Sequence, residues 1–159
     1  HLPLISAAKW FKDWVHLTPC PPDQRVLDAL EEKGVPYEID EETGDFSVLV
    51  ECKDGRTQDV IIRSGTREFM GVEMRDIISI ALVSQGPFDA RTANFLLREN
   101  TDVGFGSWQI FRDDDNSHIA FFCMTISANL RAESLVELIR MVAGTADEIE
   151  HRLSGLDQY

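Results

Sequence analysis

The chain has 159 residues, of which 43% are hydrophobic and 27% charged, and its formal net charge is −13 at pH 7. A chain of this length usually forms one domain that buries roughly 70% of the surface its unfolded form exposes. The negative charge repels phosphate backbones and so argues against general nucleic-acid binding. No apolar run approaches the roughly 20 residues of a membrane-spanning helix, so we expect no membrane partner.

The cysteines and the start of the chain predict the compartment. Cys20, Cys52 and Cys123 are far apart and form no C-x-x-C pair, which argues against a disulfide framework and a zinc site. No signal-peptide pattern is present. We therefore expect a cytoplasmic protein. His1 is interpreted as a remnant of expression, with a trimmed native start as the alternative.

Residues 1–22 are predicted to form a unit of their own, an aromatic helix followed by a Pro-rich linker. Between about residues 4 and 15, the large apolar residues Trp10, Phe11, Trp14 and Val15 recur at helical spacing. The prolines from Pro19 onward end this helix. The ridge formed by the two tryptophans must be buried, either on the rest of the chain or on a second subunit or partner.

Residues 23–159 are predicted to form a single α+β domain. Its first half consists of a helix capped by Asp23, a short strand near Ile39, a strand over 46–52, a two-residue turn at Asp54-Gly55, and a returning strand over 56–63. Residues 64–73 are predicted to form a loop. Residues 74–83 fit either a helix or a strand, and their length and isoleucine content favour a strand buried on both faces.

The second half of this domain contains two helices and a hairpin. Asp89 caps a helix that reaches about residue 100, with Ala93, Leu96 and Leu97 facing inward. Strands over 104–111 and 118–127 follow, and a long helix carries an apolar stripe from about residue 135 to 153. The predicted order is (α)-α-β-β-β-α-β-β-α, and adjacent strands between helices indicate an antiparallel sheet.

The sequence contains no catalytic or cofactor motif that we can identify. Asp113, Asp115 and Ser117 resemble the start of a calcium loop, but His118 stands where that loop needs glycine and Met124 where it needs glutamate. The four histidines are scattered and lack partners at ligand spacing. We therefore expect no enzyme activity, no cofactor and no metal site.

The middle of the chain is less acidic than its ends. Residues 55–112 contain seven acidic and seven basic side chains, whereas residues 23–54 contain eleven acidic and three basic ones. The arginines of this basic stretch are Arg56, Arg63, Arg67 and Arg75. They are interpreted either as solvated residues in ion pairs or as a docking patch for an acidic partner.

The second half of the chain resembles a known family. The resemblance is carried by the segment LLRENTDVGFGSWQI (Leu96–Ile110), the turn DDDN, the strand HIAFFCMTI and the segment LRAESLVELIRMVAGTADEIEHRL (Leu130–Leu153). Together they resemble the YbjN-like family, also called bacterial sensory transduction regulators, which shares the fold of class I type III secretion chaperones. The resemblance covers about Phe88–Leu153, and upstream only the element order agrees. Asn100 and Gly106 are expected to adopt unusual backbone angles there.

The resemblance implies a compact, usually dimeric domain that binds protein segments or regulates through contacts, without enzyme activity or cofactor. We therefore expect a non-enzymatic interaction module, chaperone-like or regulatory, that forms a homodimer and binds a protein or peptide partner. Phe88, Phe95 and Trp108 are predicted near the dimer surface, and Trp10 and Trp14 form the second candidate surface. Ordinary core positions are the alternative for all five.

Two other functions remain open at the level of sequence. A small-molecule-binding or enzymatic domain would need a deep pocket with convergent polar groups. A structural subunit of a larger assembly would need a large, permanently buried apolar surface.

Overall fold

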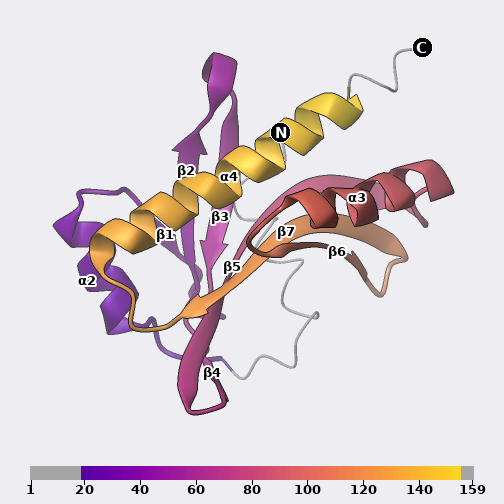
Figure 1. Cartoon of the computed structure of the whole chain (residues 1–159). Coiled ribbons are helices and arrows are strands. Elements are labelled where there is room, and N and C mark those ends of the chain that lie inside the picture. Colours follow the sequence, from indigo (N-terminus) through magenta and orange to yellow (C-terminus); the bar gives the residue numbers. More distant parts are fainter. Residues whose placement is uncertain (1–18, 155–159) are drawn as a thin grey trace.

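The structure is a computed structural model that describes residues 19–154. The predicted helix with Trp10 and Trp14 lies outside these residues. Within them, the chain forms a seven-stranded antiparallel sheet and three helices, so the predicted α+β class and element order are confirmed (Figure 1). None of these helices combines the length and the apolar character that a membrane crossing requires.

The helices are α2 (Gln24–Glu32), α3 (Ala90–Asp102) and α4 (Ala132–Ser154). The strands are β1 (Glu38–Ile39), β2 (Phe46–Glu51), β3 (Thr57–Ile62), β4 (Arg67–Phe69), β5 (Val72–Gln85), β6 (Ser107–Arg112) and β7 (Ser117–Ser127). Along the sheet they lie in the order β1-β2-β3-β5-β7-β6, and β4 pairs with one end of β5. Among the described strands, β6 is therefore an edge strand.

Local sequence signals set several boundaries as predicted. The carboxylate of Asp23 accepts a hydrogen bond from the Arg25 amide, and that of Asp89 accepts one from the Thr92 amide, so both aspartates cap their helices. Asp54 and Gly55 have φ angles of 57° and 73° in the turn between β2 and β3. The turn lies at the predicted position, but the connection is longer than two residues, because the last paired residues of the two strands are Glu51 and Thr57 and a 3-10 turn over Lys53–Gly55 lies between them.

Strand β5 resolves the ambiguous segment over residues 74–83 in favour of a strand. Ile77 and Ile78 are adjacent, point to opposite faces of the sheet, and are both 0% exposed. A helix would place these neighbours about 100° apart on its surface, whereas this segment buries both faces. The strand is also longer than predicted, because it continues to Gln85 in its pairing with β7.

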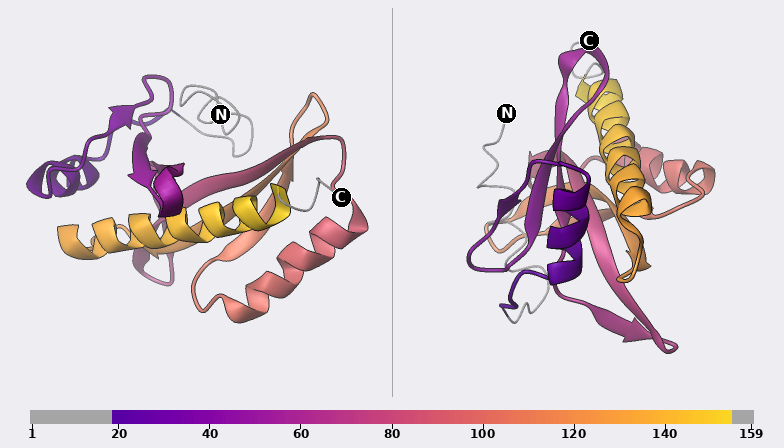
Figure 2. Two further views of the ribbon diagram at one scale, coloured as in Figure 1. Left: turned by 90° about the horizontal axis from the view of Figure 1, so that it is seen from above. Right: turned by 90° about the vertical axis from the view of Figure 1, so that its left-hand side faces the viewer.

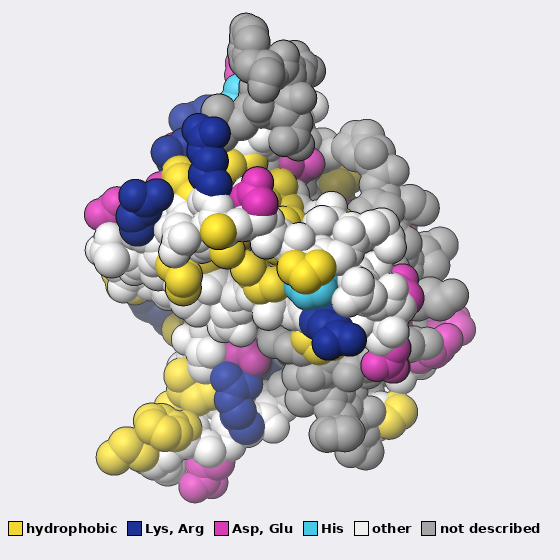
Figure 3. Space-filling view, turned by 90° about the vertical axis from the view of Figure 1, so that its right-hand side faces the viewer, with side chains coloured by type: hydrophobic (Ala, Val, Ile, Leu, Met, Phe, Trp, Pro, Cys, Tyr) yellow, Lys and Arg dark blue, Asp and Glu magenta, His cyan; other side chains and the backbone are white. Residues whose placement is uncertain are grey.

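The prediction of a loop over residues 64–73 is wrong, because β4 and β5 form a hairpin there. Met70 and Gly71 make its turn with φ angles of 51° and 80°. The guanidinium of Arg67 binds the carboxylate of Asp76 at 2.7 Å, and this pair across the hairpin links residues nine apart in the sequence. Hydrophobic side chains at the tip project from the body at the lower left of Figure 3, where Phe69 is 67% exposed.

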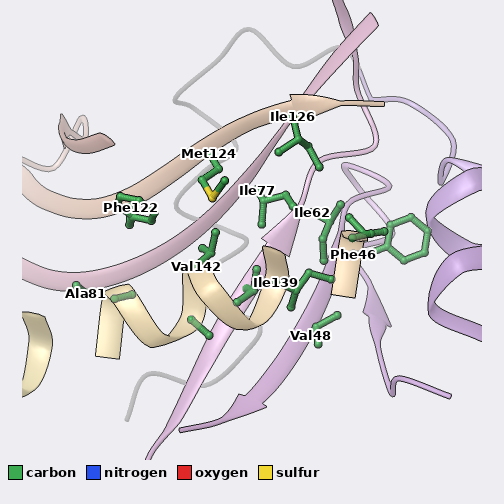
Figure 4. Packing of buried hydrophobic residues seen from close by; sticks show 14 of the residues in the cluster. Phe46, Val48, Ile62, Ile77, Ala81, Phe122, Met124, Ile126, Ile139 and Val142 are labelled. Atoms are coloured by element: carbon green, nitrogen blue, oxygen red, sulfur yellow. The ribbon is translucent and has the colours of Figure 1, made fainter. Parts of the chain in front are cut away.

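The three helices lie on one face of the sheet, which we call the front face (Figure 2). In the front core, Ile139 and Val142 of α4 pack against strand residues such as Phe46, Ile77 and Phe122 (Figure 4). Each large side chain buried in this way contributes about 1.5–3 kcal/mol. The opposite face, which we call the rear face, carries a second apolar cluster.

Candidate functional site

An open groove runs along α4 on the front of the molecule. It lies between α4, strand β2 and the segment that follows α2, and its volume is about 930 Å³. Its apolar lining includes Val48 and Val50 from β2 and Val136 and Ile139 from α4. Because β2 alternates its side chains between faces, Val48 and Val50 both point toward α4.

Gly144 lines this groove in the middle of α4. Glycine inside a helix is about 0.5–1 kcal/mol less favourable than alanine. A Cβ atom added at Gly144 would meet no atom within 4 Å, so no described neighbour requires a glycine there. The missing side chain instead leaves the groove wider at this point.

Two charged residues that line the groove, Arg56 and Asp147, form an ion pair with each other. The Arg56 guanidinium donates to both carboxylate oxygens of Asp147 at 2.8 Å, and Asp147 is only 4% exposed. The hydrogen bonds from Arg56 lower the pKa of Asp147 below its usual value. These groups are therefore committed to structure rather than directed at a reacting group.

The rim of the groove carries cations that lack a carboxylate partner. Lys53 and Arg140 line the groove and form no ion pair with any residue in 19–154. Lys33, on the same rim, pairs with Glu133 of α4 at 3.1 Å. The same lining also includes the acidic residues Glu51, Asp54 and Glu148, so the groove carries charges of both signs.

The basic stretch in the middle of the chain is accounted for by ion pairs. The pairs are Arg56–Asp147 at 2.8 Å, Arg63–Asp45 at 3.0 Å, Arg67–Asp76 at 2.7 Å and Arg75–Asp23 at 2.7 Å. Arg63 and Arg75 are also buried, at 4% and 1% exposure. The ion-pair interpretation is therefore confirmed, and these arginines do not form an open docking patch.

Phe88 and Phe95 come together at a second hollow, of about 630 Å³, between α3, the end of β5 and the end of α4. The Arg152 guanidinium lies 4.9 Å from the centre of the Phe95 ring. Trp108 does not reach this surface, because it is 5% exposed and packs on Phe122 with ring centres 5.4 Å apart. For Trp108 the core alternative holds, whereas an interface role for Phe88 and Phe95 stays a prediction.

Hydrophobic side chains gather on the surface formed by α3 and β6, across the middle of Figure 3. Leu97 of α3, Phe105 of the connecting loop and Ile110 of β6 are 65%, 64% and 43% exposed. The prediction that Leu97 faces inward is wrong. Only Leu96 among the α3 residues is fully buried, because α3 contacts the sheet mainly through its edge strand β6.

Asn100 and Gly106 each have a structural role in the segment that leads into strand β6. Gly106 has a φ of 74°, and a Cβ atom there would lie 2.5 Å from the Cys123 carbonyl oxygen, so only glycine fits. The expectation of an unusual backbone at Asn100 is wrong, because this residue is helical within α3. Its side-chain amide instead accepts from the Trp108 amide at 2.6 Å and donates to the Trp108 carbonyl at 3.3 Å.

Residues 19–154 contain no group of three or more His, Cys, Asp or Glu side chains placed to hold a metal ion. The turn with Asp113 and Asp115 uses its carboxylates locally, since Asp115 accepts from the Ser117 amide at 2.8 Å. No protein-family model matches this chain, and a search of curated proteins finds no match either.

Sequence reasoning missed the groove along α4. Its lining comes from three segments that lie far apart in the chain, and no pattern within one segment marks it. Gly144, placed in the middle of an otherwise regular helical stripe, is the one signal that was available in the sequence.

Proposed function

We propose that this protein is a non-enzymatic interaction module, chaperone-like or regulatory, that binds an extended segment of a partner protein in the groove along α4. The proposal includes membership of the YbjN-like family, a homodimer and a cytoplasmic location. The partner segment places apolar side chains on the valine floor and carboxylates near Lys53 and Arg140.

The observation that carries this proposal is Gly144. A helix stabilised by a long apolar stripe tolerates the lower helix propensity of one glycine, and its open flank gives a partner backbone close access to α4. A small-molecule or catalytic site would instead present unsatisfied polar groups toward the cavity. In this groove the buried pair Arg56–Asp147 is already satisfied.

The homodimer is proposed to form through the surface of α3 and β6. Leu97 and Phe105 are each more than half exposed there, and exposed apolar groups of this kind mark interfaces. At the edge of β6 the backbone groups of Trp108 are occupied by Asn100. Pairing through side chains of α3 is therefore favoured over simple extension of the sheet at this point.

The groove is tested with Gly144→Leu in the full chain, compared with Thr145→Leu at the adjacent position, which does not line the groove. A library of fluorescently labelled 15-residue peptides that combine apolar and acidic residues serves as the probe, and anisotropy reports binding. The leucine at 144 fills the groove, so we expect roughly tenfold weaker binding or worse, a loss of about 1.4 kcal/mol.

Stability separates a blocked groove from a damaged fold. Leucine has a higher helix propensity than glycine by about 0.6–0.8 kcal/mol, so Gly144→Leu is expected to unfold at the same or a higher urea concentration. Equal peptide affinity in Gly144→Leu and the unaltered chain contradicts the groove as the binding site. Absence of any peptide binding to the unaltered chain contradicts the proposed function itself.

A further inference from the structure

The outer edge of strand β2 is only partly covered by its neighbour β1. The two strands pair at two positions, Glu38 with Ser47 and Ile39 with Phe46. The remaining residues of β2, 48–51, pair with β3 on one side and with no residue in 19–154 on the other. This part of β2 extends beyond β1 (Figure 1) and spans about 13 Å.

The hydrogen bonds at the two ends of β2 show which backbone groups face this open edge. The Cys52 amide donates to the Arg56 carbonyl at 2.7 Å, so the even-numbered residues of β2 direct their backbone groups toward β3. The Asp45 carbonyl accepts a hydrogen bond from the residue that follows β1, so the odd-numbered residues face the opposite way. The N–H and C=O groups of Leu49 and Glu51 therefore point outward, past the end of β1.

The segment that precedes β1 cannot cover this edge. If β1 continued in the same register, Pro36 would lie opposite Leu49. Proline has no N–H to donate to the Leu49 carbonyl. Gly34 would lie opposite Glu51, but its φ of 63° belongs to the left-handed stop after α2 and not to an extended strand. The chain therefore turns away toward α2 and leaves the edge of β2 open.

The open edge borders the groove along α4. The lining of the groove includes residues 48–51 on one side and residues 33–36 on the other. The hollow therefore lies where a further strand would continue the sheet, about 4.8 Å beyond β2. Leu49 is 54% exposed, so this edge is accessible.

We propose that the partner segment binds as an additional strand on the open edge of β2, with its backbone hydrogen-bonded to Leu49 and Glu51. This inference rests on the proposed function of the groove and specifies how the groove recognises its partner. The outward backbone groups repeat at every second residue, about 6.8 Å apart, a spacing that an extended polypeptide matches. An exposed strand edge is a ready template for such pairing.

Strand addition also determines which kind of segment fits. Val48 and Val50 direct their side chains to the front face, so every second residue of the added strand points the same way. These residues meet the apolar lining that α4 contributes, including Val136 and Ile139. The expected partner segment therefore has apolar side chains at alternate positions and no proline where its backbone bonds to β2.

Amide hydrogen exchange, measured by NMR on the full chain, tests the pairing directly. The probe is the tightest-binding member of the 15-residue peptide library, at a saturating concentration. We expect exchange of the Leu49 and Glu51 amides to slow by roughly tenfold or more, because they become hydrogen-bonded. The amides of Val48 and Val50 face β3 without the peptide, so they are the internal control and should change much less.

N-methylation of the same peptide, one residue at a time, tests the pairing from the other side. A methyl group removes one backbone donor and blocks close approach of that edge. We expect binding to weaken by roughly three- to tenfold at alternate residues of the paired stretch, with little change at the residues between them. This period of two is the signature of a paired strand.

A variant of β2 provides a third measurement. Leu49→Pro removes the outward amide and keeps the hydrogen bonds to β3, and proline is tolerated where the N–H faces away from the sheet. Leu49→Ala removes the same side chain but keeps the amide, so it is the matched control. We expect the proline variant to bind the peptide roughly three- to tenfold more weakly than the alanine variant. Circular dichroism verifies that both are folded.

The outcomes separate this inference from the proposed function. Peptide binding with unchanged exchange at Leu49 and Glu51 and no period of two in the methylation scan would overturn strand addition and leave the groove as the binding site. Absence of peptide binding would overturn both. Exchange at Leu49 and Glu51 that slows with protein concentration alone would also overturn the inference, because a second copy would then occupy the edge.

Discussion

Asp23 joins a helix cap to a buried ion pair. Its carboxylate accepts from the Arg25 amide at 2.9 Å and from the Arg75 guanidinium at 2.7 Å. Arg75 is 1% exposed and donates a further hydrogen bond to the Arg63 carbonyl. Burial alone would raise the pKa of Asp23, but the hydrogen bonds from Arg25 and Arg75 outweigh it and hold the pKa well below its usual value.

Replacement of Asp23 by alanine is expected to destabilise the protein by about 3–5 kcal/mol, because it leaves the buried Arg75 cation unpaired. Urea unfolding at pH 7 measures the change. Asp28→Ala, on the exposed side of the same helix, is the control and should change the stability by less than about 0.5 kcal/mol. A loss below about 1 kcal/mol for Asp23→Ala would show that the pair with Arg75 stabilises little.

The pKa of Asp59 is shifted upward, in the opposite direction to that of Asp23. One of its carboxylate oxygens is buried without a hydrogen-bond partner, and burial, followed by the nearby Glu38 carboxylate, raises its pKa to about 6. The folded state therefore retains a proton that the unfolded chain, with a pKa of about 3.9, has released. The contribution of Asp59 to the free energy of unfolding is therefore most favourable below about pH 4, and it becomes unfavourable as the pH rises to about 6.

Asp59→Asn should remove this penalty. We expect the variant to be more stable than the unaltered chain at pH 7 by about 1 kcal/mol, a value reduced for solvent screening because the group is only half buried. At pH 4 the two proteins should have nearly the same stability. Urea unfolding at both pH values measures the difference, and an equal gain at pH 4 and pH 7 would show that titration of Asp59 is not the cause.

At the scale of elements, the β4–β5 hairpin carries backbone strain at an exposed position. Met70 adopts a φ of 51° and is 88% exposed, with Phe69 beside it at 67%. The left-handed conformation costs a side chain such as methionine roughly 1 kcal/mol, whereas asparagine tolerates it. The hairpin therefore presents a methionine where stability alone favours asparagine.

Met70→Asn is expected to stabilise the protein by about 0.5–1 kcal/mol, because it relieves the strain in the turn. Met70→Ala removes the same side chain but keeps an unfavourable residue at a positive φ, so it is the matched control and should give no comparable gain. Thermal unfolding monitored by circular dichroism measures both. A gain of the same size in the two variants would show that exposure of methionine, not backbone strain, is the destabilising feature.

At the scale of the whole molecule, the prediction concerns assembly. The proposed dimer uses Leu97, which is 65% exposed on α3. We expect light scattering to give the mass of a dimer for the unaltered chain and of a monomer for Leu97→Asp, because a carboxylate there would be desolvated in the interface. Met141→Asp, at a 44% exposed position of α4, is the control and should remain a dimer.

A monomeric mass for the unaltered chain at high concentration would contradict the dimer and weaken the family resemblance that implies it. It would not contradict the proposed binding site in the groove along α4, because residues of one chain alone line that groove. Binding in the groove and pairing through α3 are therefore tested separately.

Much of the fold follows from signals within single segments. The caps at Asp23 and Asp89, the turn at Asp54-Gly55 and the apolar stripe of α4 each depend on residues a few positions apart, so their structures could be predicted. The hairpin after residue 64 could not, because charged residues at its edge replace the alternation that marks a strand.

The sequence by itself determined the α+β class, the order of the elements and the absence of recognised motifs, because these depend on local periodicity and spacing. Only the tertiary structure decided the rest. It paired the arginines of the basic stretch with distant aspartates, placed Trp108 in the core and Leu97 on the surface, and opened a groove at Gly144. Such features depend on which segments become neighbours, and that is set by packing across the whole sheet rather than by any one stretch of residues.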